Sequence, residues 1–168
     1  MGTTGTFQVY RAKPSDAQAI TGFLASATGG RVSVAPQVVK ERFGAKGLWL
    51  ARDAGGKIVG LAGWRAENLV ARIDDFLIFP AELYTSAGRM LIEGIEKAAQ
   101  ELQCEVSMIF VPLRAASGLV AFYQTCGYRR PKGEGLPRVW RQTIEEATER
   151  GRFVMLKQLR EDLVLRPM

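Results

Sequence analysis

A tyrosine near the end of an apolar segment is the side chain best suited to deliver a proton. Tyr123 belongs to the segment Ala121–Tyr128, which reads Ala-Phe-Tyr-Gln-Thr-Cys-Gly-Tyr. The spacing predicts a short helix that ends at Gly127, because glycine readily takes the left-handed conformation that closes a helix. A phenol, with an ordinary pKa of about 10, can protonate a departing thiolate. A tyrosine that only packs at the helix end, with its hydroxyl hydrogen-bonded, explains the pattern equally well.

A second segment, Tyr84-Thr85-Ser86-Ala87-Gly88, has small side chains after its first residue and precedes a helical pattern. The N–H groups in the first turn of a helix have no carbonyl partner within that helix, and the helix dipole places positive charge there. Both effects favour the binding of a phosphate group. Small residues are also common as simple helix caps, so this segment alone leaves both explanations open.

The acidic residues of the strand before this turn are the candidate general bases. Asp74 lies two residues after Arg72, so the two side chains point to the same face of a strand. Arg72 cannot be the base, because a guanidinium group stays protonated. Asp74 is therefore the first candidate, ahead of Asp75 on the opposite face and Glu67 at the start of the strand. An ion pair between Asp74 and an arginine is an equally good explanation of the pattern.

Residue types that are rare or absent exclude several mechanisms. The 168 residues include no histidine and only two cysteines. A Ser-His-Asp or Cys-His mechanism is therefore excluded, as is a four-cysteine zinc site. No cluster of carboxylates indicates an all-oxygen metal site, so no metal is predicted. Cys104 and Cys126 lie in apolar contexts, which indicates buried free thiols and a cytoplasmic protein.

The elements that must position these residues alternate along the chain. Apolar patterns predict strands at 7–11, 48–52, 58–65, 68–79, 105–113, from Tyr128 onward, and at 152–159. Helical spacing predicts helices at 16–27, 36–43, 88–103, 117–125 and 137–150. This order is typical of an α/β (α+β) protein with a central mixed β-sheet flanked by helices. We expect one domain over residues 1–168, with an extra helical segment at about 131–151.

The charge and hydropathy patterns limit the choice of partner. The net charge of +6 is scattered, and it is densest over residues 129–138. That patch could meet phosphates of a cofactor or of a nucleic acid, but scattered surface charge is the simpler interpretation and no nucleic-acid partner is expected. No apolar run is long enough to span a bilayer, and residues 1–16 lack the apolar core of a signal peptide, so no membrane association is predicted.

Four segments, taken in order, resemble the motifs of the GNAT superfamily of acyl-coenzyme A-dependent N-acyltransferases. Tyr10–Asp16 resembles the first strand and helix start of that family. Pro80 followed by Leu83–Ile95 resembles its central strand-turn-helix motif. Phe122–Tyr128 resembles its Phe-Tyr-x-x-x-Gly-Phe motif, and Met155–Leu159 resembles its last strand. The resemblance extends over roughly residues 7–160.

The sequence also departs from the family's pattern at four positions. Leu83 stands where the family usually has Gln or Arg, and Ser86 stands where it has the first Gly. Ala116 replaces a common Asn, and Arg72 replaces a Glu that some lysine-modifying members carry. Family members bind the pyrophosphate mainly through backbone N–H groups, and Ser86 still has one.

The resemblance implies that the protein transfers an acetyl group from acetyl-CoA to a primary amine, by direct attack in a ternary complex. Coenzyme A would lie between strands 70–79 and 105–113, with its pyrophosphate over residues 84–89. Tyr123 would protonate the leaving thiolate, with Asp74 as the candidate base. The implied contacts with the cofactor are Leu77, Ile78, Tyr84, Thr85, Ser86, Ala87, Gly88 and Arg89. Backbone groups of Leu77 and Ile78 would pair with the pantetheine arm and stabilise the oxyanion.

Two other functions remain open. A GNAT-shaped module that binds acyl-CoA or a protein partner without catalysis would fit the changed residues Leu83 and Ser86. A nucleic-acid binder that uses residues 129–138 is the third interpretation. The acceptor, a small-molecule or peptide amine, would be selected by the variable segments 26–48 and 129–151. The extra helix could also support a homodimer.

Overall fold

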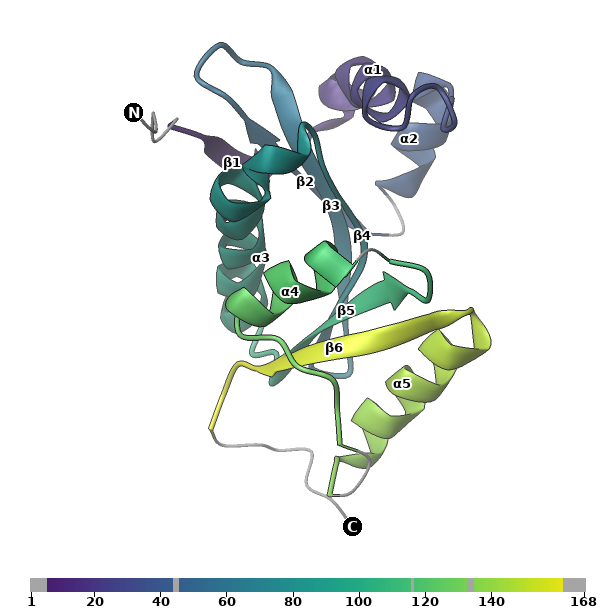
Figure 1. The fold of residues 1–168 in the computed structure, drawn as a ribbon, viewed down its shortest axis with the longest axis vertical. Helices are drawn as coiled ribbons and strands as arrows, with labels where there is room; N and C mark the ends of the chain where they lie inside the picture. Colours follow the sequence, from purple (N-terminus) through teal and green to yellow (C-terminus); the bar gives the residue numbers. More distant parts are fainter. Residues whose placement is uncertain (1–5, 44–45, 116, 133–134, 162–168) are drawn as a thin grey trace. The chain divides into compact units, whose positions relative to one another are not determined.

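The computed structural model describes residues 6–43, 46–115, 117–132 and 135–161. Its strands form a six-stranded sheet in the order β1-β2-β3-β4-β5-β6 (Figure 1). The chain divides into two compact units: unit 1 comprises residues 1–65 and 75–95, and unit 2 comprises residues 66–74 and 96–168. The prediction of a single domain stays a prediction. Among the described residues, no helix is both long and apolar enough to cross a membrane.

Unit 1 is built on antiparallel strands that carry two helices. The elements are β1 (Gln8–Arg11), the 3₁₀ turn Pro14–Asp16, α1 (Ala17–Ala27), α2 (Pro36–Arg42), β2 (Gly47–Arg52) and β3 (Ile58–Glu67). β2 pairs antiparallel with both β1 and β3. Ile20 and Phe23 of α1 and Val39 of α2 are buried in one cluster with Leu48 and Leu50 of β2. The apolar spacing that predicted these helices therefore forms this part of the core.

The turn between β3 and β4 (Val70–Ile78) lies two residues later in the chain than the sequence predicts. Asn68 and Leu69 have φ angles of 53° and 64°, so both residues are left-handed. Such a pair matches the two-residue hairpin turn that follows the twist of antiparallel strands. The predicted strand start at Asn68 is therefore wrong by two residues. Leucine rarely takes a positive φ, so its side chain was no signal for a turn.

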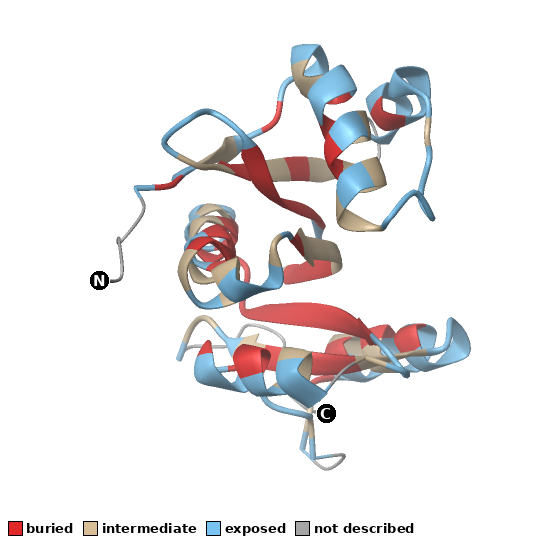
Figure 2. Ribbon diagram, turned by 45° about the horizontal axis from the view of Figure 1, so that its top comes forward, coloured by how far each residue is buried: buried red, intermediate tan, exposed pale blue. Residues whose placement is uncertain are grey.

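Unit 2 combines one parallel and one antiparallel strand pair with a covering helix. Its elements are the start of β4, β5 (Val106–Pro112), α4 (Ser117–Thr125), α5 (Arg138–Glu149) and β6 (Arg152–Gln158). β5 pairs parallel with β4, from Val70–Val106 to Ile73–Ile109, and antiparallel with β6. Trp140 and Ala147 of α5 are buried against these strands, and the outer face of α5 is exposed (Figure 2). The predicted mixed sheet with flanking helices is confirmed.

The predicted strand from Tyr128 onward is wrong in its extent. In the described part of this segment, Arg129 forms an isolated bridge with Leu156, with N–H to carbonyl distances of 2.9 and 2.8 Å. Pro131, two residues later, has no N–H group to donate to a longer ladder. Residues 130–132 and 135–137 of the described chain carry no strand structure, and α5 (Arg138–Glu149) follows them.

A glycine in β3 creates the space into which side chains of neighbouring elements of unit 1 pack. A Cβ atom built on Gly60 would lie 2.8 Å from Ile78 Cδ1, 3.2 Å from Ala51 Cβ and 3.3 Å from Leu91 Cδ2. Ile78, Ala51 and Leu91 are all buried. Tightly packed interiors tolerate added volume poorly, so this position requires the smallest residue.

Gly60→Ala should lower the free energy of unfolding by about 1–3 kcal/mol, because the added methyl group overpacks this site. Gly22→Ala is the matched control, since its Cβ in α1 would meet no atom within 4 Å. The control should raise the free energy of unfolding by about 0.5–1 kcal/mol, because alanine lowers the conformational entropy of the unfolded chain. Urea unfolding monitored by circular dichroism measures both, and equal shifts in the two variants would contradict the packing argument.

Candidate functional site

In unit 1, β4 leads through a short connection into a wide helical turn. The connection contains a cis peptide bond between Phe79 and Pro80 and a 3₁₀ turn at Ala81–Leu83. Tyr84–Gly88 then forms a single π-helical turn, followed directly by α3 (Arg89–Glu101). The predicted helix start at Gly88 agrees within one residue with the start of α3, whereas the helical turn before it was predicted only as a segment of small residues. Single π-turns within helices are frequent at functional sites.

The N–H groups at the two ends of this turn are hydrogen-bonded. Tyr84 N–H donates to the carbonyl of Ala81, and Leu83 N–H donates to that of Pro80 at 3.1 Å. Arg89 N–H, at the other end, donates to the carbonyl oxygen of Tyr84. These bonds fix the backbone on both sides of the small residues.

The N–H groups between these ends differ in this respect. The N–H groups of Thr85, Ser86 and Ala87 donate no hydrogen bond to any described residue outside the helix itself. The Ser86 hydroxyl instead donates to the Leu83 carbonyl at 3.3 Å. First-turn N–H groups point out of the helix along its axis, towards the positive end of the dipole. This turn therefore has the donors that an anion needs.

Burial explains why the residues of this turn are small. Ala87 and Gly88 are buried, and Ala87 packs in an apolar cluster with Phe7 and Val59. Leu83 packs against the same cluster. Leu83 therefore serves the core and offers no polar group to a ligand. The donors of the turn come from its backbone.

The end of β4 supplies a further backbone donor. Phe79 N–H donates to the Val59 carbonyl of β3 at 2.9 Å. Successive residues of a strand direct their N–H groups to opposite edges, so the Leu77 N–H points towards β3 and the Ile78 N–H points away from it. The Leu77 side chain packs against the core cluster below α1 and α2, and the Ile78 side chain is buried.

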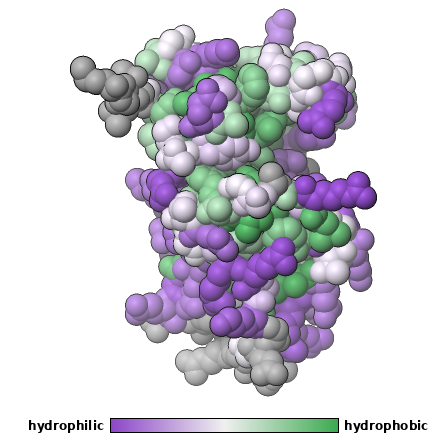
Figure 3. Space-filling model, viewed as in Figure 1, coloured by the Kyte–Doolittle hydropathy of each residue, from purple (hydrophilic) through white to green (hydrophobic). Residues whose placement is uncertain are grey.

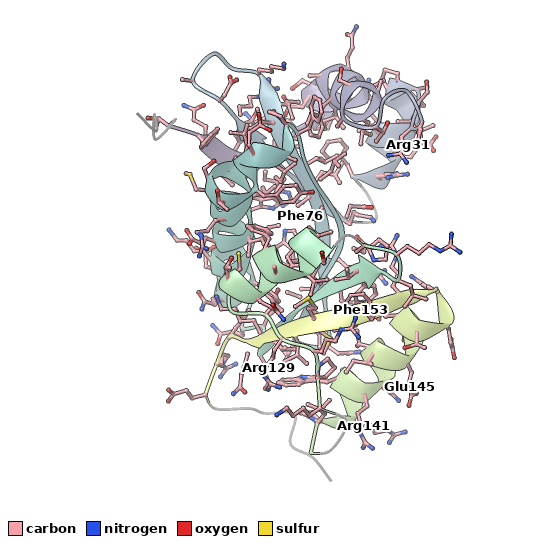
Figure 4. All side chains as sticks on the ribbon, in the orientation of Figure 1. Arg31, Phe76, Arg129, Arg141, Glu145 and Phe153 are labelled. Atoms are coloured by element: carbon pink, nitrogen blue, oxygen red, sulfur yellow. The ribbon has the colours of Figure 1, made fainter. Side chains whose placement is uncertain are left out.

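The hydroxyl of Tyr84 forms a hydrogen bond with the backbone of Ile78. Burial raises the pKa of Tyr84, and a hydrogen bond with the Ile78 backbone partly offsets that rise in pKa. A bond that lowers the pKa of a phenol must be donated to its oxygen, so the donor is the Ile78 N–H. The Tyr84 ring lies 6.2 Å from that of Phe76, which is labelled on β4 in Figure 4. Any ligand that binds the Ile78 N–H must displace this hydroxyl.

In unit 2, Tyr123 lies in the last turn of α4, as predicted. Its side chain is buried, and its ring centroid lies 5.6 Å from that of Phe122. The helix closes at Gly127, whose φ is 95°. Tyr128 N–H donates to the Tyr123 carbonyl at 3.1 Å, and Gly127 N–H donates to that of Gln124 at 3.0 Å. This pair of bonds is a Schellman closure, and it accounts for the glycine of the motif.

Tyr128 anchors the segment after this closure. Its hydroxyl donates to Ser107 Oγ of β5 at 2.8 Å. Burial raises the pKa of Tyr128 well above its ordinary value, and the nearby charge of Glu96 raises it further. The aromatic residue that follows Gly127 in the motif therefore has a structural role, because its ring and its hydroxyl are both buried in unit 2.

The candidate bases lie in different surroundings. Asp75, in unit 1, forms an ion pair with Lys46 at 2.8 Å. Asp74, in unit 2, is half-buried, and its backbone carbonyl accepts a hydrogen bond from Arg152 Nη1 at 2.7 Å. The proposed role of Asp74 as base stays a prediction.

Arg72 forms ion pairs that sequence reasoning missed. Its guanidinium contacts Glu67 at 3.0 Å and Glu146 of α5 at 2.9 Å, and it lies 5.1 Å from the Phe110 ring centroid. Glu146 is the neighbour of Glu145, which Figure 4 labels on α5. Both glutamates are exposed, but Glu146 also reaches the buried Arg72. No local pattern in the sequence connects these two residues.

The remaining candidates add no reactive group. Cys104 and Cys126 are buried and free, and burial raises the pKa of the Cys104 thiol. Within the described ranges, no group of three or more potential ligand side chains is placed to hold a metal ion. Ala116 lies outside the described residues.

The basic segment after α4 is partly committed to packing. The Arg130 guanidinium lies 3.9 Å from the ring centroid of Phe153, which Figure 4 labels on β6. Hydrophilic side chains occupy many places on the face in Figure 3, rather than one continuous stripe. Neither observation favours the nucleic-acid interpretation.

Comparison with protein families gives one match. Residues 15–138 match a family model described as an acetyltransferase (GNAT) domain. No curated protein sequence matches the chain.

Solved structures resemble the chain over almost its whole length. The ribosomal-protein-S18-alanine N-acetyltransferase of Escherichia coli is 11% identical, with a TM-score of 0.68 and coverage of 95% of this chain and 97% of that one. A GNAT-family acetyltransferase of Staphylococcus aureus Mu50 is 15% identical, with a TM-score of 0.67 and coverage of 92% and 100%. A phosphinothricin acetyltransferase of Sinorhizobium meliloti in complex with acetyl-CoA is 16% identical, with a TM-score of 0.67 and coverage of 99% and 94%. At these identities the likeness establishes the fold.

The raised pKa of Tyr128 predicts a loss of stability in alkali. Above pH about 10 the tyrosine of the unfolded chain releases its proton, while the buried Tyr128 keeps its own, so stability falls as pH rises. The resulting fall in the free energy of unfolding approaches about 1.4 kcal/mol per pH unit. Tyr128→Phe should remove this slope. Urea unfolding of both proteins from pH 7 to 11 measures this slope. The difference between their free energies of unfolding should stay constant up to about pH 9 and narrow above about pH 10. A constant difference throughout would contradict the prediction.

Proposed function

Because the chain belongs to the GNAT family of acetyltransferases, we propose that it transfers the acetyl group of acetyl-CoA to a primary amine by direct attack in a ternary complex. The observation that carries the proposal is the π-helical turn Tyr84–Gly88, whose central N–H groups donate no hydrogen bond outside the helix to any residue that the structure describes. A diphosphate is an anion that such a set of backbone donors fits.

The residues of the turn support binding through the main chain. The N–H groups of Thr85, Ser86 and Ala87 would contact the pyrophosphate, and the buried Ala87 and Gly88 leave no bulky side chain in its way. Arg89 follows directly, with a permanent positive charge. The replacements at positions 83 and 86 change side chains only, so they remove no backbone donor.

At the acyl end, the Ile78 N–H would receive the thioester carbonyl. The Tyr84 hydroxyl is hydrogen-bonded to this N–H, and the carbonyl of the cofactor would replace it there. Exchanging one hydrogen bond for another of similar strength costs little. The same N–H would stabilise the negative charge that develops on the carbonyl oxygen during attack. Leu77 would contribute through its side chain, which supports the strand from the core.

The protein's own residues would handle two protons. Acetyl-CoA supplies an activated acyl group with a thiolate as the leaving group. The amine attacks only when it is neutral, so Asp74 would accept its proton, directly or through water. Tyr123 holds a phenolic proton at neutral pH and would give it to the departing sulfur.

The direct test is release of free thiol from acetyl-CoA in the presence of a panel of amines. The structural relatives named above act on a ribosomal-protein alanine and on phosphinothricin, so the panel should contain peptide N-termini as well as small amines. Tyr123→Phe should lower kcat by about 100-fold or more, because the thiolate then leaves unprotonated.

Tyr10→Phe is the control for that variant, since it removes a hydroxyl that binds Arg52 in unit 1. It should leave kcat unchanged. Binding of coenzyme A without turnover for any amine would instead favour a catalytically silent module. Equal rates for wild-type protein and Tyr123→Phe would reject the tyrosine as the proton donor.

Thr85→Glu tests the pyrophosphate site separately from chemistry. Thr85 is exposed in the first turn, where an acidic side chain favours the helix dipole and should leave folding stability unchanged or slightly higher. The new charge would repel a diphosphate, so the Kd for coenzyme A should rise about tenfold, or about 1.4 kcal/mol. Gln100→Glu places the same charge at an exposed position in the last turn of α3 and should not change Kd. Isothermal titration calorimetry measures both, and an unchanged Kd for Thr85→Glu would place the diphosphate elsewhere.

A cytoplasmic location and a homodimer formed through α5 remain part of the proposal. The exposed outer face of α5 is compatible with a dimer contact. Sedimentation of the purified protein measures its mass in solution.

A further inference from the structure

A buried polar network lies at the end of α4 in unit 2, and the mechanism above does not use it. The ammonium group of Lys157, on β6, lies 3.2 Å from Oε1 and 2.9 Å from Oε2 of Glu96. The same ammonium donates to the Cys126 carbonyl at 3.1 Å. The Glu96 side chain is 9% exposed and that of Lys157 is 36% exposed, so the carboxylate is shielded from water while the lysine remains partly exposed.

The position of Lys157 matches a general need at helix ends. The last carbonyl groups of a helix have no N–H partner within it, and the dipole places negative charge there. A lysine that donates to such a carbonyl satisfies it and stabilises the end. α4 has only nine residues, a length at which a helix is marginal without tertiary support. The Lys157 contact with Cys126 gives that support.

The glycine of the aromatic motif makes room for this lysine. A Cβ atom on Gly127 would lie 3.2 Å from Lys157 Cε and 3.4 Å from Lys157 Cδ. The Lys157 ammonium also lies 6.0 Å from the centroid of the Tyr128 ring. Gly127 therefore serves two purposes: it takes the positive φ that closes α4, and it leaves the path of the lysine stem open.

The clamped peptide is connected directly to Tyr123. Cys126 N–H donates to the Tyr123 carbonyl at 3.1 Å, and Tyr128 N–H donates to the same oxygen at 3.1 Å. Lys157 holds the carbonyl of Cys126, and Glu96 holds Lys157. The backbone that carries the Tyr123 side chain is thereby tied to α3 and to β6.

We propose that Lys157, oriented by Glu96, is a positioning residue for Tyr123, because it fixes the last turn of α4 from which the proton donor extends. This inference rests on the proposed function, since it requires that Tyr123 deliver a proton to the leaving thiolate. Small displacements of a reacting group lower the rate steeply, so loss of the clamp should act on kcat and not on cofactor binding.

A double-mutant cycle tests the proposal. Lys157→Met keeps the length of the stem but removes the charge. It should lower kcat for acetyl transfer by about tenfold to a hundredfold, with KM for acetyl-CoA unchanged within about twofold. In the Tyr123→Phe background the same substitution should have no further effect on kcat, because the group that it positions is gone.

Matched controls separate positioning from general damage. Lys97→Met makes the same change at the exposed residue next to Glu96, and it should leave kcat unchanged. Glu96→Gln keeps an oxygen for Lys157 but removes the charge; it should lower kcat less than Lys157→Met does. If Lys157→Met does not fold, Glu96→Gln takes its place in the double-mutant cycle with Tyr123→Phe. The exposed Glu93→Gln is then the control.

The outcomes distinguish this inference from the function on which it rests. If the losses in kcat from Lys157→Met and Tyr123→Phe multiply in the double variant, the positioning role is overturned. The transferase proposal then remains intact. An equal loss in kcat from Lys97→Met overturns the positioning role as well. Absence of turnover by the wild-type protein overturns the proposed function and this inference with it.

Discussion

The candidate site depends on one constraint at the end of β4. The backbone groups there lie beyond the described pairs of β4 with β5, and they need other hydrogen-bond partners. The last of these pairs joins Ile73 to Ile109, while β4 continues to Ile78. Polar backbone groups in a protein interior need partners. Arg152 supplies one for the Asp74 carbonyl, and Tyr84 supplies one for the Ile78 N–H. Side chains thus satisfy these backbone groups of the strand.

The turn after β4 follows from the same principle. A π-helical turn widens the start of α3, and the connection before it uses the N–H groups of Leu83 and Tyr84 internally. The donors of Thr85–Ala87 are thereby concentrated in one short stretch. A Gln or Arg side chain at position 83 is not needed for this arrangement. Leu83 packs against an apolar core cluster instead, and the donors of the turn belong to the backbone.

The aromatic motif of α4 has a physical explanation at each position. Phe122 and Tyr128 are buried, Gly127 closes the helix, and the space above Gly127 admits the stem of Lys157. Tyr123, the remaining residue of the motif, is buried in the last turn of α4. A tyrosine held in a clamped helix end is suited to proton transfer, since its orientation is set before a substrate binds.

The sequence by itself determined the elements and the backbone features that depend on near neighbours. The helix end at Gly127, the small residues of 85–88 and, apart from the strand expected at Tyr128, the order of strands and helices were readable, because local geometry and apolar spacing follow from adjacent residues. Only the tertiary structure decided which distant side chains meet. Arg72 and Glu146 are 74 positions apart, and Lys157 and Glu96 are 61 apart. Such pairs form only when the sheet brings its strands and helices together, so no local pattern could have indicated them.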